Sequence, residues 1–287
     1  MPIWISDQRL LVFGPGYVGS AVARDATAVA IAVTAITRSD DAVPALAQAT
    51  HLLSTVPPDT SGDPVLSRYG DAIASAPQLR WIGYLSTTGV YGDRGGAWVD
   101  EASEPAPTAD RGHRRLAAEQ AWRRFADRCA VDIFRLAGIY GPGRSALDDV
   151  RAGTARRVIK PGHAFGRIHR DDIVRAVLAA MRQDRPAGAR VLNLADDAPA
   201  ESAEVVAEAA RLLGVALPPA VPFGQIADAM SPMARSFWAE NRKVASARTQ
   251  QALGLRWRYP SYREGLRGIL AEERRQGPGQ QRQVVRP

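Results

Sequence analysis

The sequence predicts an α/β fold in which helices cover both faces of a doubly wound parallel sheet. Three observations carry this prediction. Short apolar segments alternate with helical patterns through the first two-thirds of the chain, as in sheets built from β-α-β units. A glycine-rich turn, residues 14–19, joins the first apolar segment to the first helical pattern, and hydroxyl side chains follow a later apolar segment. Because open α/β sheets bind ligands at the carboxyl ends of their strands, these turns are candidates for function.

The composition of the 287-residue chain is that of a globular protein. Hydrophobic residues make up 46% of it, enough for one large or two modest domains. The longest apolar candidate, residues 26–36, is too short to span a membrane. The N-terminus lacks the basic and apolar regions of a signal peptide. One cysteine, Cys129, excludes an internal disulfide and suits a reducing compartment. We therefore expect a cytoplasmic location and no membrane partner.

The net charge of +7 is scattered and does not indicate nucleic-acid binding. Part of the excess lies in residues 274–287, a polar, aperiodic stretch that predicts a disordered basic tail. No basic run is interleaved with aromatic residues, as a stacking platform for nucleic acid requires. The four histidines and the cysteine show no metal-ligand spacing, and no Gly-x-Ser-x-Gly turn indicates a serine hydrolase. We expect neither a nucleic-acid partner nor a metal site.

The opening turn has the pattern of a dinucleotide-binding site. It reads Gly14-Pro15-Gly16-Tyr17-Val18-Gly19, between the apolar run 10–13 and an Ala- and Val-rich helical pattern. In such a turn the first glycine permits the tight bend, the second lets the backbone approach a pyrophosphate, and the third lets the helix pack on the strand. The helix N-terminus then presents N–H groups and a positive dipole to the phosphates. We predict that all six residues contact the cofactor.

The next apolar segment, residues 30–37, predicts the second strand. The residues at its end bear on whether the cofactor is NAD or NADP. The adenosine ribose is met about twenty residues beyond the glycines, where this chain has Thr37, Arg38 and Ser39. A guanidinium between two hydroxyls suits a 2′-phosphate, so NADP is favoured. Asp40 and Asp41 follow directly, and a two-residue shift in register would favour NAD instead.

The remaining elements follow in order. Residues 51–56 predict a third strand that Pro57 and Pro58 end, residues 81–85 a fourth, 131–136 a fifth and 190–195 a sixth. Helices are predicted over residues 63–75, 111–127 and 202–213, and another begins within 167–174, where Asp171 and Asp172 suit the helix dipole. Further predicted cofactor contacts at strand ends are Thr55, Val56, Pro57, Ser86, Thr87 and Tyr140.

Four stretches together resemble the extended short-chain dehydrogenase/reductase superfamily, the branch of sugar-nucleotide epimerases and dehydratases. They are the glycine turn, Leu85-Ser-Thr-Thr-Gly-Val-Tyr-Gly92, Arg135-Leu-Ala-Gly-Ile-Tyr-Gly-Pro-Gly143 and Ile168-His-Arg-Asp-Asp-Ile-Val174. The chain departs from the usual Gly-x-x-Gly-x-x-Gly spacing, and residues 259–266 look like those of an atypical subgroup. The resemblance implies a Rossmann-type NAD(P)-binding domain, residues 1–140 with 168–196, and a smaller substrate domain, residues 141–167 with 197–273.

The same resemblance implies a catalytic hydroxyl at Thr87, which would also contact the cofactor. In the family this hydroxyl works with a Tyr-x-x-x-Lys helix, but spacing places the tyrosine position at Arg111 and the lysine position at Arg115. A guanidinium does not give up its proton in proteins, so Arg111 would bind rather than transfer a proton. Arg115 could still bind the cofactor ribose or a phosphate.

Helical spacing places Arg111, Arg114 and Arg115 on one face, where an anionic substrate would neutralise their positive charge. Glu119 would form an ion pair with Arg115. The alternative to a substrate-binding face is an exposed basic stripe on a solvated helix. Among other proton donors Tyr91 is the first choice, because its loop follows a strand; a regular helix would turn His113 away.

Two functions follow. The favoured one is a NADP-dependent oxidoreductase or epimerase/dehydratase-like enzyme acting on a polar, anionic, sugar-nucleotide-like substrate, with NAD as the alternative cofactor. The other is a non-catalytic NADP-binding sensor or assembly protein, which the replaced tyrosine and lysine favour. By analogy with the superfamily, the helices at 63–75 and 111–127 would pair in a homodimer.

Overall fold

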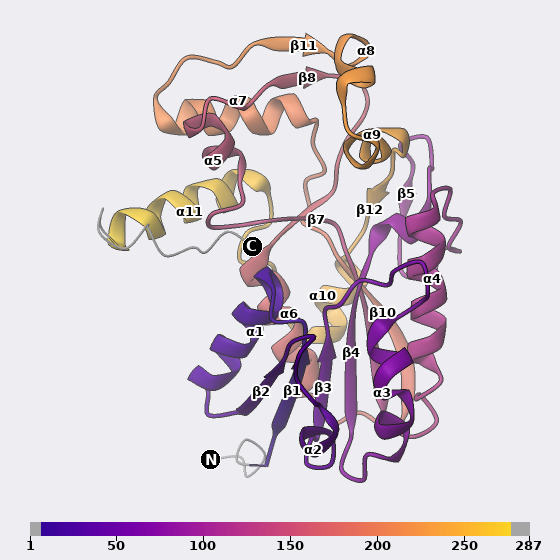
Figure 1. Ribbon diagram of the computed structural model, residues 1–287. Helices are drawn as coiled ribbons and strands as arrows, with labels where there is room; N and C mark the ends of the chain where they lie inside the picture. Colours follow the sequence, from indigo (N-terminus) through magenta and orange to yellow (C-terminus); the bar gives the residue numbers. More distant parts are fainter. Residues whose placement is uncertain (1–6, 277–287) are drawn as a thin grey trace.

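The computed structural model describes residues 7–276 and is centred on a six-stranded parallel sheet in the order β10-β6-β4-β3-β1-β2 (Figure 1). The strands are β1 Arg9–Phe13, β2 Ala32–Ile36, β3 His51–Ser54, β4 Trp81–Thr87, β6 Ala130–Leu136 and β10 Gly188–Leu194. All six predicted strands are present within a few residues of their expected bounds, so the prediction of a Rossmann-type parallel sheet is confirmed.

The strand order creates a topological switch point between β1 and β3. From β1 the chain crosses to β2 on one side and then returns to β3 on the other. Loops that leave such a pair diverge above the sheet, which opens a crevice at the carboxyl ends of the strands. The glycine turn follows β1 and Thr55 follows β3, so both predicted segments lie at this crevice.

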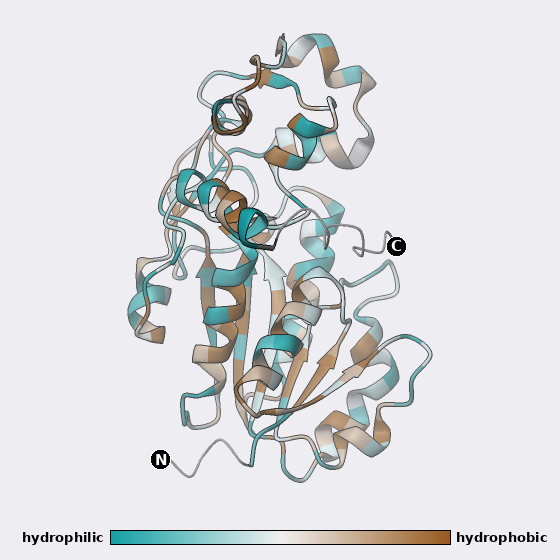
Figure 2. Ribbon diagram, turned by 90° about the vertical axis from the view of Figure 1, so that its left-hand side faces the viewer, coloured by the Kyte–Doolittle hydropathy of each residue, from teal (hydrophilic) through white to brown (hydrophobic). Residues whose placement is uncertain are grey.

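Helices cover both faces of the sheet, each through its own core (Figure 1). One face packs against α1 Tyr17–Ala28, α6 Arg170–Met181 and α10 Ala247–Leu253. The opposite face packs against α2 Val43–Leu46, α3 Pro64–Ser75 and α4 Asp110–Arg123. The sheet between them is mostly hydrophobic (Figure 2), and β3 and β6 are buried at every residue, as expected for strands covered on two faces.

A third, smaller core lies beyond the carboxyl ends of the strands. It joins α5 Ala146–Arg151, α7 Ser202–Leu213 and α11 Tyr262–Gln276. Three short parallel pairs lie outside the large sheet: β8 Arg157–Ile159 with β11 Ala220–Pro222, β7 Gly138–Tyr140 with β9 Arg167–His169, and β5 Trp98–Val99 with β12 Lys243–Val244. The last pair packs on the first core through Val99 and Val244. The turns η1 Thr88–Tyr91 and η2 Ala227–Ala229 and the helices α8 Phe223–Ile226 and α9 Pro232–Ala239 complete the chain.

The C-terminal region differs from the sequence prediction in two respects. Helix α11 continues to Gln276, so Arg274–Gln276 are helical rather than part of a disordered tail. The rest of the predicted tail, residues 277–287, lies outside the described residues. Helix α10 packs on the large sheet through Leu253, although the prediction grouped it with the smaller domain. Within residues 7–276, no helix has the length and apolar character to cross a membrane.

One buried carboxylate ties the amino ends of three strands together. Asp132 on β6 is fully buried and accepts hydrogen bonds from Trp81 Nε1 at 2.8 Å, Arg185 Nη1 at 2.7 Å and Arg190 Nε at 2.7 Å. The two guanidiniums are partly exposed, so solvent covers the outer side of this network.

We predict that Asp132→Ala lowers the free energy of unfolding by about 3 kcal/mol, because it leaves buried donors without their acceptor. The exposed Asp184 makes a matched control, and Asp184→Ala should change the same quantity by less than about 0.5 kcal/mol. Urea unfolding of both variants measures the difference. Equal stabilities would contradict a structural role for this network.

Candidate functional site

The glycine turn is held by contacts that leave no room for larger residues. Gly14 has φ +80°, which favours glycine, and its N–H donates to Ile36 O at 3.1 Å. A Cβ on Gly19 would lie 2.4 Å from Gly14 O, so α1 packs directly against the end of β1. Thr55 Oγ1 donates to the same carbonyl at 2.5 Å. A Cβ on Gly14 would lie 2.9 Å from Val56, so the segment that follows β3 packs directly against the turn.

The same turn is open at Gly16. A Cβ there would meet nothing within 4 Å. Helix α1 begins at the next residue, and no side chain caps its N-terminus. The first N–H groups of a helix without a side-chain cap are free to bind an anion. The predicted glycine-turn residues and Thr55 are therefore brought together around an opening that fits a pyrophosphate.

Tyr17 connects this opening to the smaller core. Its hydroxyl donates to Pro142 O at 3.0 Å, and burial raises its pKa to about 12. The guanidiniums of Arg144 and Arg170 lie 5.7 and 5.2 Å from the ring centre. Two cations therefore flank the first residue of α1. The sequence analysis did not identify Arg170, which lies far along the chain at the start of α6.

The segment after β2 favours the arginine over the carboxylates as a cofactor contact. Asp40 Oδ2 accepts from Thr37 N at 2.7 Å and from Thr37 Oγ1 at 2.6 Å, and these bonds lower the pKa of Asp40. Ser39 Oγ lies 3.1 Å from Thr37 Oγ1. Within residues 7–276, the exposed guanidinium of Arg38 forms no hydrogen bond or ion pair. Asp40 closes the loop, whereas Arg38 is left available.

The two hydroxyls at the end of β4 point to different places. Ser86 is buried and donates to Glu119 Oε1 at 2.5 Å, so it supports α4 rather than the crevice. Thr87 is half-buried and its Oγ1 accepts from Gly89 N at 3.1 Å, which leaves its O–H as a donor. Of the two predicted residues, the structure presents Thr87 for binding.

The predicted tyrosines lie in the cores. Tyr91 is fully buried and donates to Asn193 Oδ1 at 2.8 Å, and burial raises its pKa. Tyr140 is also buried, with its hydroxyl 3.4 Å from Ser261 O, and burial raises its pKa as well. A buried phenol with a raised pKa and no route to the crevice is a poor proton donor. We therefore do not retain Tyr91 as one, nor Tyr140 as a cofactor contact.

The arginines of α4 are close enough for the charges of Arg114 and Arg115 to act on Arg111, but the three side chains differ in burial. Arg115 is buried, and its Nη1 donates to Tyr84 OH at 3.0 Å and to Leu85 O at 2.9 Å. It therefore supports β4 from behind and does not face the cofactor opening. Arg111 is exposed, with its guanidinium 5.7 Å from the Phe237 ring. Partial burial and the charges of Arg115 and Arg114 lower its pKa.

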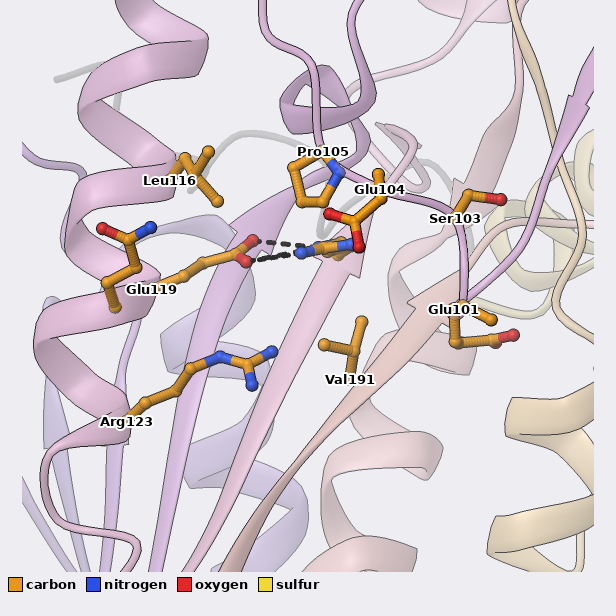
Figure 3. Close-up of a pocket in the computed structure, with 11 residues that line it drawn as sticks. Glu101, Ser103, Glu104, Pro105, Leu116, Glu119, Arg123 and Val191 are labelled. Carbon is orange, nitrogen blue, oxygen red and sulfur yellow. Dashed lines mark hydrogen bonds and ion pairs between the residues drawn. The ribbon is translucent and has the colours of Figure 1, made fainter.

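Glu119 does not pair with Arg115, contrary to the sequence prediction. Its carboxylate is buried against Arg135 on β6, with Nη2 and Oε2 2.8 Å apart. This ion pair forms one wall of a cavity of about 370 Å³ between α4 and the 101–105 loop (Figure 3). Arg123 and Val191 also line it. The cavity lies on the α4 side of β6 and β10, away from the glycine turn, and it is not the predicted cofactor site.

Within the described part of the chain, no cluster of three or more His, Cys, Asp or Glu could hold a metal ion.

Comparison with known proteins identifies relatives of the whole chain. No family model matches the sequence. The solved structure of a conserved protein of unknown function from Silicibacter pomeroyi DSS is 43% identical, and the match covers 92% of this chain and 99% of that one with a TM-score of 0.84. Protein YeeZ of Escherichia coli K12 is 33% identical over 188 residues. That match covers 63% of this chain and 65% of YeeZ, slightly less than two-thirds of its length.

More distant structures share the fold. Human epimerase family protein SDR39U1 (isoform 2), solved with NADPH, has a TM-score of 0.78 at 20% identity, covering 93% of this chain and 100% of that one. MoeE5, solved with UDP-glucuronic acid and NAD, has a TM-score of 0.75 at 22% identity, covering 94% and 100%. These matches confirm the fold that the motif resemblance implied.

The packing of the glycine turn predicts effects of different size for two similar substitutions. Gly19→Ala should lower the free energy of unfolding by about 1–3 kcal/mol, because the new methyl group overlaps a backbone carbonyl. Gly16→Ala points into open space and should lower it by less than about 1 kcal/mol. Thermal or urea unfolding of the pair tests the contact. The packing described above would be wrong if the two variants were equally stable.

Proposed function

Because the chain belongs to the same family as the conserved Silicibacter pomeroyi protein and is an atypical member of the extended short-chain dehydrogenase/reductase superfamily, we propose that it is a NADP-dependent oxidoreductase or epimerase/dehydratase-like enzyme. The observation that carries the proposal is the glycine turn, closed at Gly19 and open at Gly16. This combination suits a pyrophosphate seated on an uncapped helix N-terminus. The nicotinamide of a bound cofactor would supply hydride transfer.

Arg38 supports NADP over NAD as the cofactor. Its guanidinium is exposed at the end of β2, whereas Asp40 is engaged by Thr37. A carboxylate that already accepts two hydrogen bonds has less capacity for ribose hydroxyls. The distant structures with this fold were solved with different cofactors, SDR39U1 with NADPH and MoeE5 with NAD.

The substrate that fits is polar and anionic, of the sugar-nucleotide type. Thr87 presents a donor, and the exposed guanidiniums of Arg111 and Arg144 lie over the rings of Phe237 and Tyr17. Guanidinium groups bind carboxylates and phosphates in preference to neutral groups. MoeE5, which shares the fold, was solved with UDP-glucuronic acid, an anionic sugar nucleotide.

The chain's own residues bind and orient the reacting groups, and the proton must come from elsewhere. Arg111 at the tyrosine position does not release a proton near neutral pH, and Tyr91 and Tyr140 are buried in the cores. Solvent water is the proton source in this proposal. Without a positioned acid or base, catalysis loses about 10²- to 10⁴-fold, so we expect slow turnover.

The second candidate is a NADP-binding protein without catalysis, a sensor or assembly protein. The buried positions of Arg115 and Tyr91 favour it. Transfer of labelled hydride between the nicotinamide and a panel of UDP-sugars and 2-oxo acids separates the two. Stereospecific exchange supports the enzyme, and tight cofactor binding with no exchange supports the sensor. In either case we propose the larger and the smaller domain described above, with α10 assigned to the larger one, a cytoplasmic location and a homodimer built on α3 and α4.

One prediction from the proposed function concerns the diphosphate site. Gly16→Ala keeps the fold but places a methyl group where the pyrophosphate would lie, so it should weaken NADP binding by about tenfold or more, since one lost charge-assisted hydrogen bond is worth that much. Calorimetric titration of NADP into the wild-type chain and the variant measures the change. Undiminished NADP affinity in the variant, or no NADP binding by the wild type, would rule out the proposed site.

The second prediction concerns the 2′-phosphate. Arg38→Asp should weaken NADP binding by about tenfold or more while leaving NAD binding within about threefold, because only NADP carries the phosphate that the guanidinium pairs with. Arg24→Asp changes the charge equally at an exposed position further along α1 and serves as the control. If both cofactors lost affinity equally, the NADP assignment would fail and the dinucleotide site would remain.

A further inference from the structure

The C-terminal part of the chain delivers an arginine to the end of β4. Strand β12 pairs with β5, with Lys243 opposite Trp98 and Val244 opposite Val99. The residue just before β12, Arg242, thereby reaches the η1 turn that follows Thr87. No motif in the sequence indicated this residue, because it is more than 150 positions from Thr87.

Arg242 is held firmly at one edge of its guanidinium. Nη1 donates to Gly92 O at 2.9 Å and pairs with Glu240 Oε2 at 2.6 Å. Glu240 is itself fixed, because Thr108 Oγ1 donates to its Oε1 at 2.6 Å. The side chain of Arg242 is only 16% exposed. A guanidinium held in this way has little conformational entropy to lose when a ligand binds its other edge.

The free edge of Arg242 and the hydroxyl of Thr87 converge on one point above Gly89. A methyl group on Gly89 would lie 3.4 Å from Thr87 Oγ1 and 3.8 Å from Arg242 Nη2. Thr87 Oγ1 accepts from Gly89 N, so its proton is available. Nη2 forms no hydrogen bond to any residue between 7 and 276. Two hydrogen-bond donors therefore lie on the same side of Gly89, each within 4 Å of the position that a Cβ would take there.

We propose that Thr87 and Arg242 form an oxyanion subsite that binds a carboxylate or phosphate oxygen of the substrate. The inference rests on the proposed function and names the group that its anionic substrate presents. Two donors select an acceptor, and a fixed guanidinium selects a negative one.

A second cation, Arg111, lies beside the η1 turn. The first turn of α4 packs on η1, since a Cβ on Gly112 would lie 3.2 Å from Gly89 O. Arg111 therefore starts α4 beside the same turn and stacks on Phe237, five residues before Arg242. Glu240 pairs with Arg242, and Asp93 also lies within electrostatic reach of it. These two carboxylates offset the charge of Arg242, and Arg111 adds a positive charge beside the same turn.

Gly89→Ala tests the subsite without removing any contact. The new methyl group is at ordinary van der Waals distance from Thr87 and Arg242 and Gly89 has no positive φ, so the melting temperature should not fall. The methyl group nevertheless occupies the point where both donors converge. Arg242→Gln removes one donor directly, and Arg248→Gln removes the same charge at an exposed position on α10.

The measurement is calorimetric titration of oxalate and of inorganic phosphate into the full chain saturated with NADP, at constant ionic strength. Saturation keeps these anions from the glycine turn. We expect the wild type and Arg248→Gln to bind at least one anion alike, and Gly89→Ala and Arg242→Gln to bind it about tenfold more weakly. Which anion binds distinguishes a carboxylate from a phosphate.

Several results would overturn the subsite: no binding of either anion by the wild type, wild-type affinity in a folded Gly89→Ala, or equal losses in Arg248→Gln. Titrating NADP alone keeps the two proposals separate. If the wild type fails to bind NADP, the proposed function falls. If NADP binds and the anions bind independently of Gly89, only the subsite falls.

Discussion

The contact between Gly19 and the carbonyl of Gly14 is the constraint on which the rest of the site depends. It brings α1 against the end of β1 closely enough that a single added carbon would overlap the backbone. The helix N-terminus is thereby aimed into the crevice where β1 and β3 diverge, and Tyr17 is carried far enough to reach Pro142. The absence of a side chain at Gly19 therefore fixes the positions of three parts relative to one another: the sheet, the opening at Gly16 and the loop after β7.

A second constraint acts behind the sheet. Ser86 is tied to Glu119, which is tied to Arg135, and Arg115 is tied to the carbonyl of the neighbouring Leu85. These groups are buried, so breaking any one of them would leave an unpaired polar group away from water. The end of β4 is consequently rigid on the side facing α4. Thr87, one residue further, is presented from a fixed base.

The parts that the sequence predicts well are those governed by local patterns. Alternating apolar segments located all six strands of the large sheet, and the helix over residues 202–213 agrees with the structure at both ends. The orientation of the side chains on α4 was harder to predict. Helical spacing shows which residues share a face, but it does not show whether that face points toward the sheet or toward the crevice. Arg115 lies against Tyr84, and Glu119 finds its partner on β6 rather than on its own helix. Arg242 reaches the end of β4 through the long-range pairing of β12 with β5, two short strands that have no local signal. Arg170 lies in a stretch with a local signal, but its contact with Tyr17 depends on the tertiary fold.

The pairing of β12 with β5 has a consequence for the order in which the chain becomes competent. During synthesis the first six strands of the parallel sheet emerge well before residue 242, and N-terminal regions generally fold first. A nascent chain stopped before residue 242 would already hold the glycine turn and Thr87 but would lack the guanidinium of Arg242. Under the two proposals above, cofactor binding and anion binding would be acquired at different times during synthesis. The first would be acquired with the sheet, and the second only when the last part of the polypeptide has joined it.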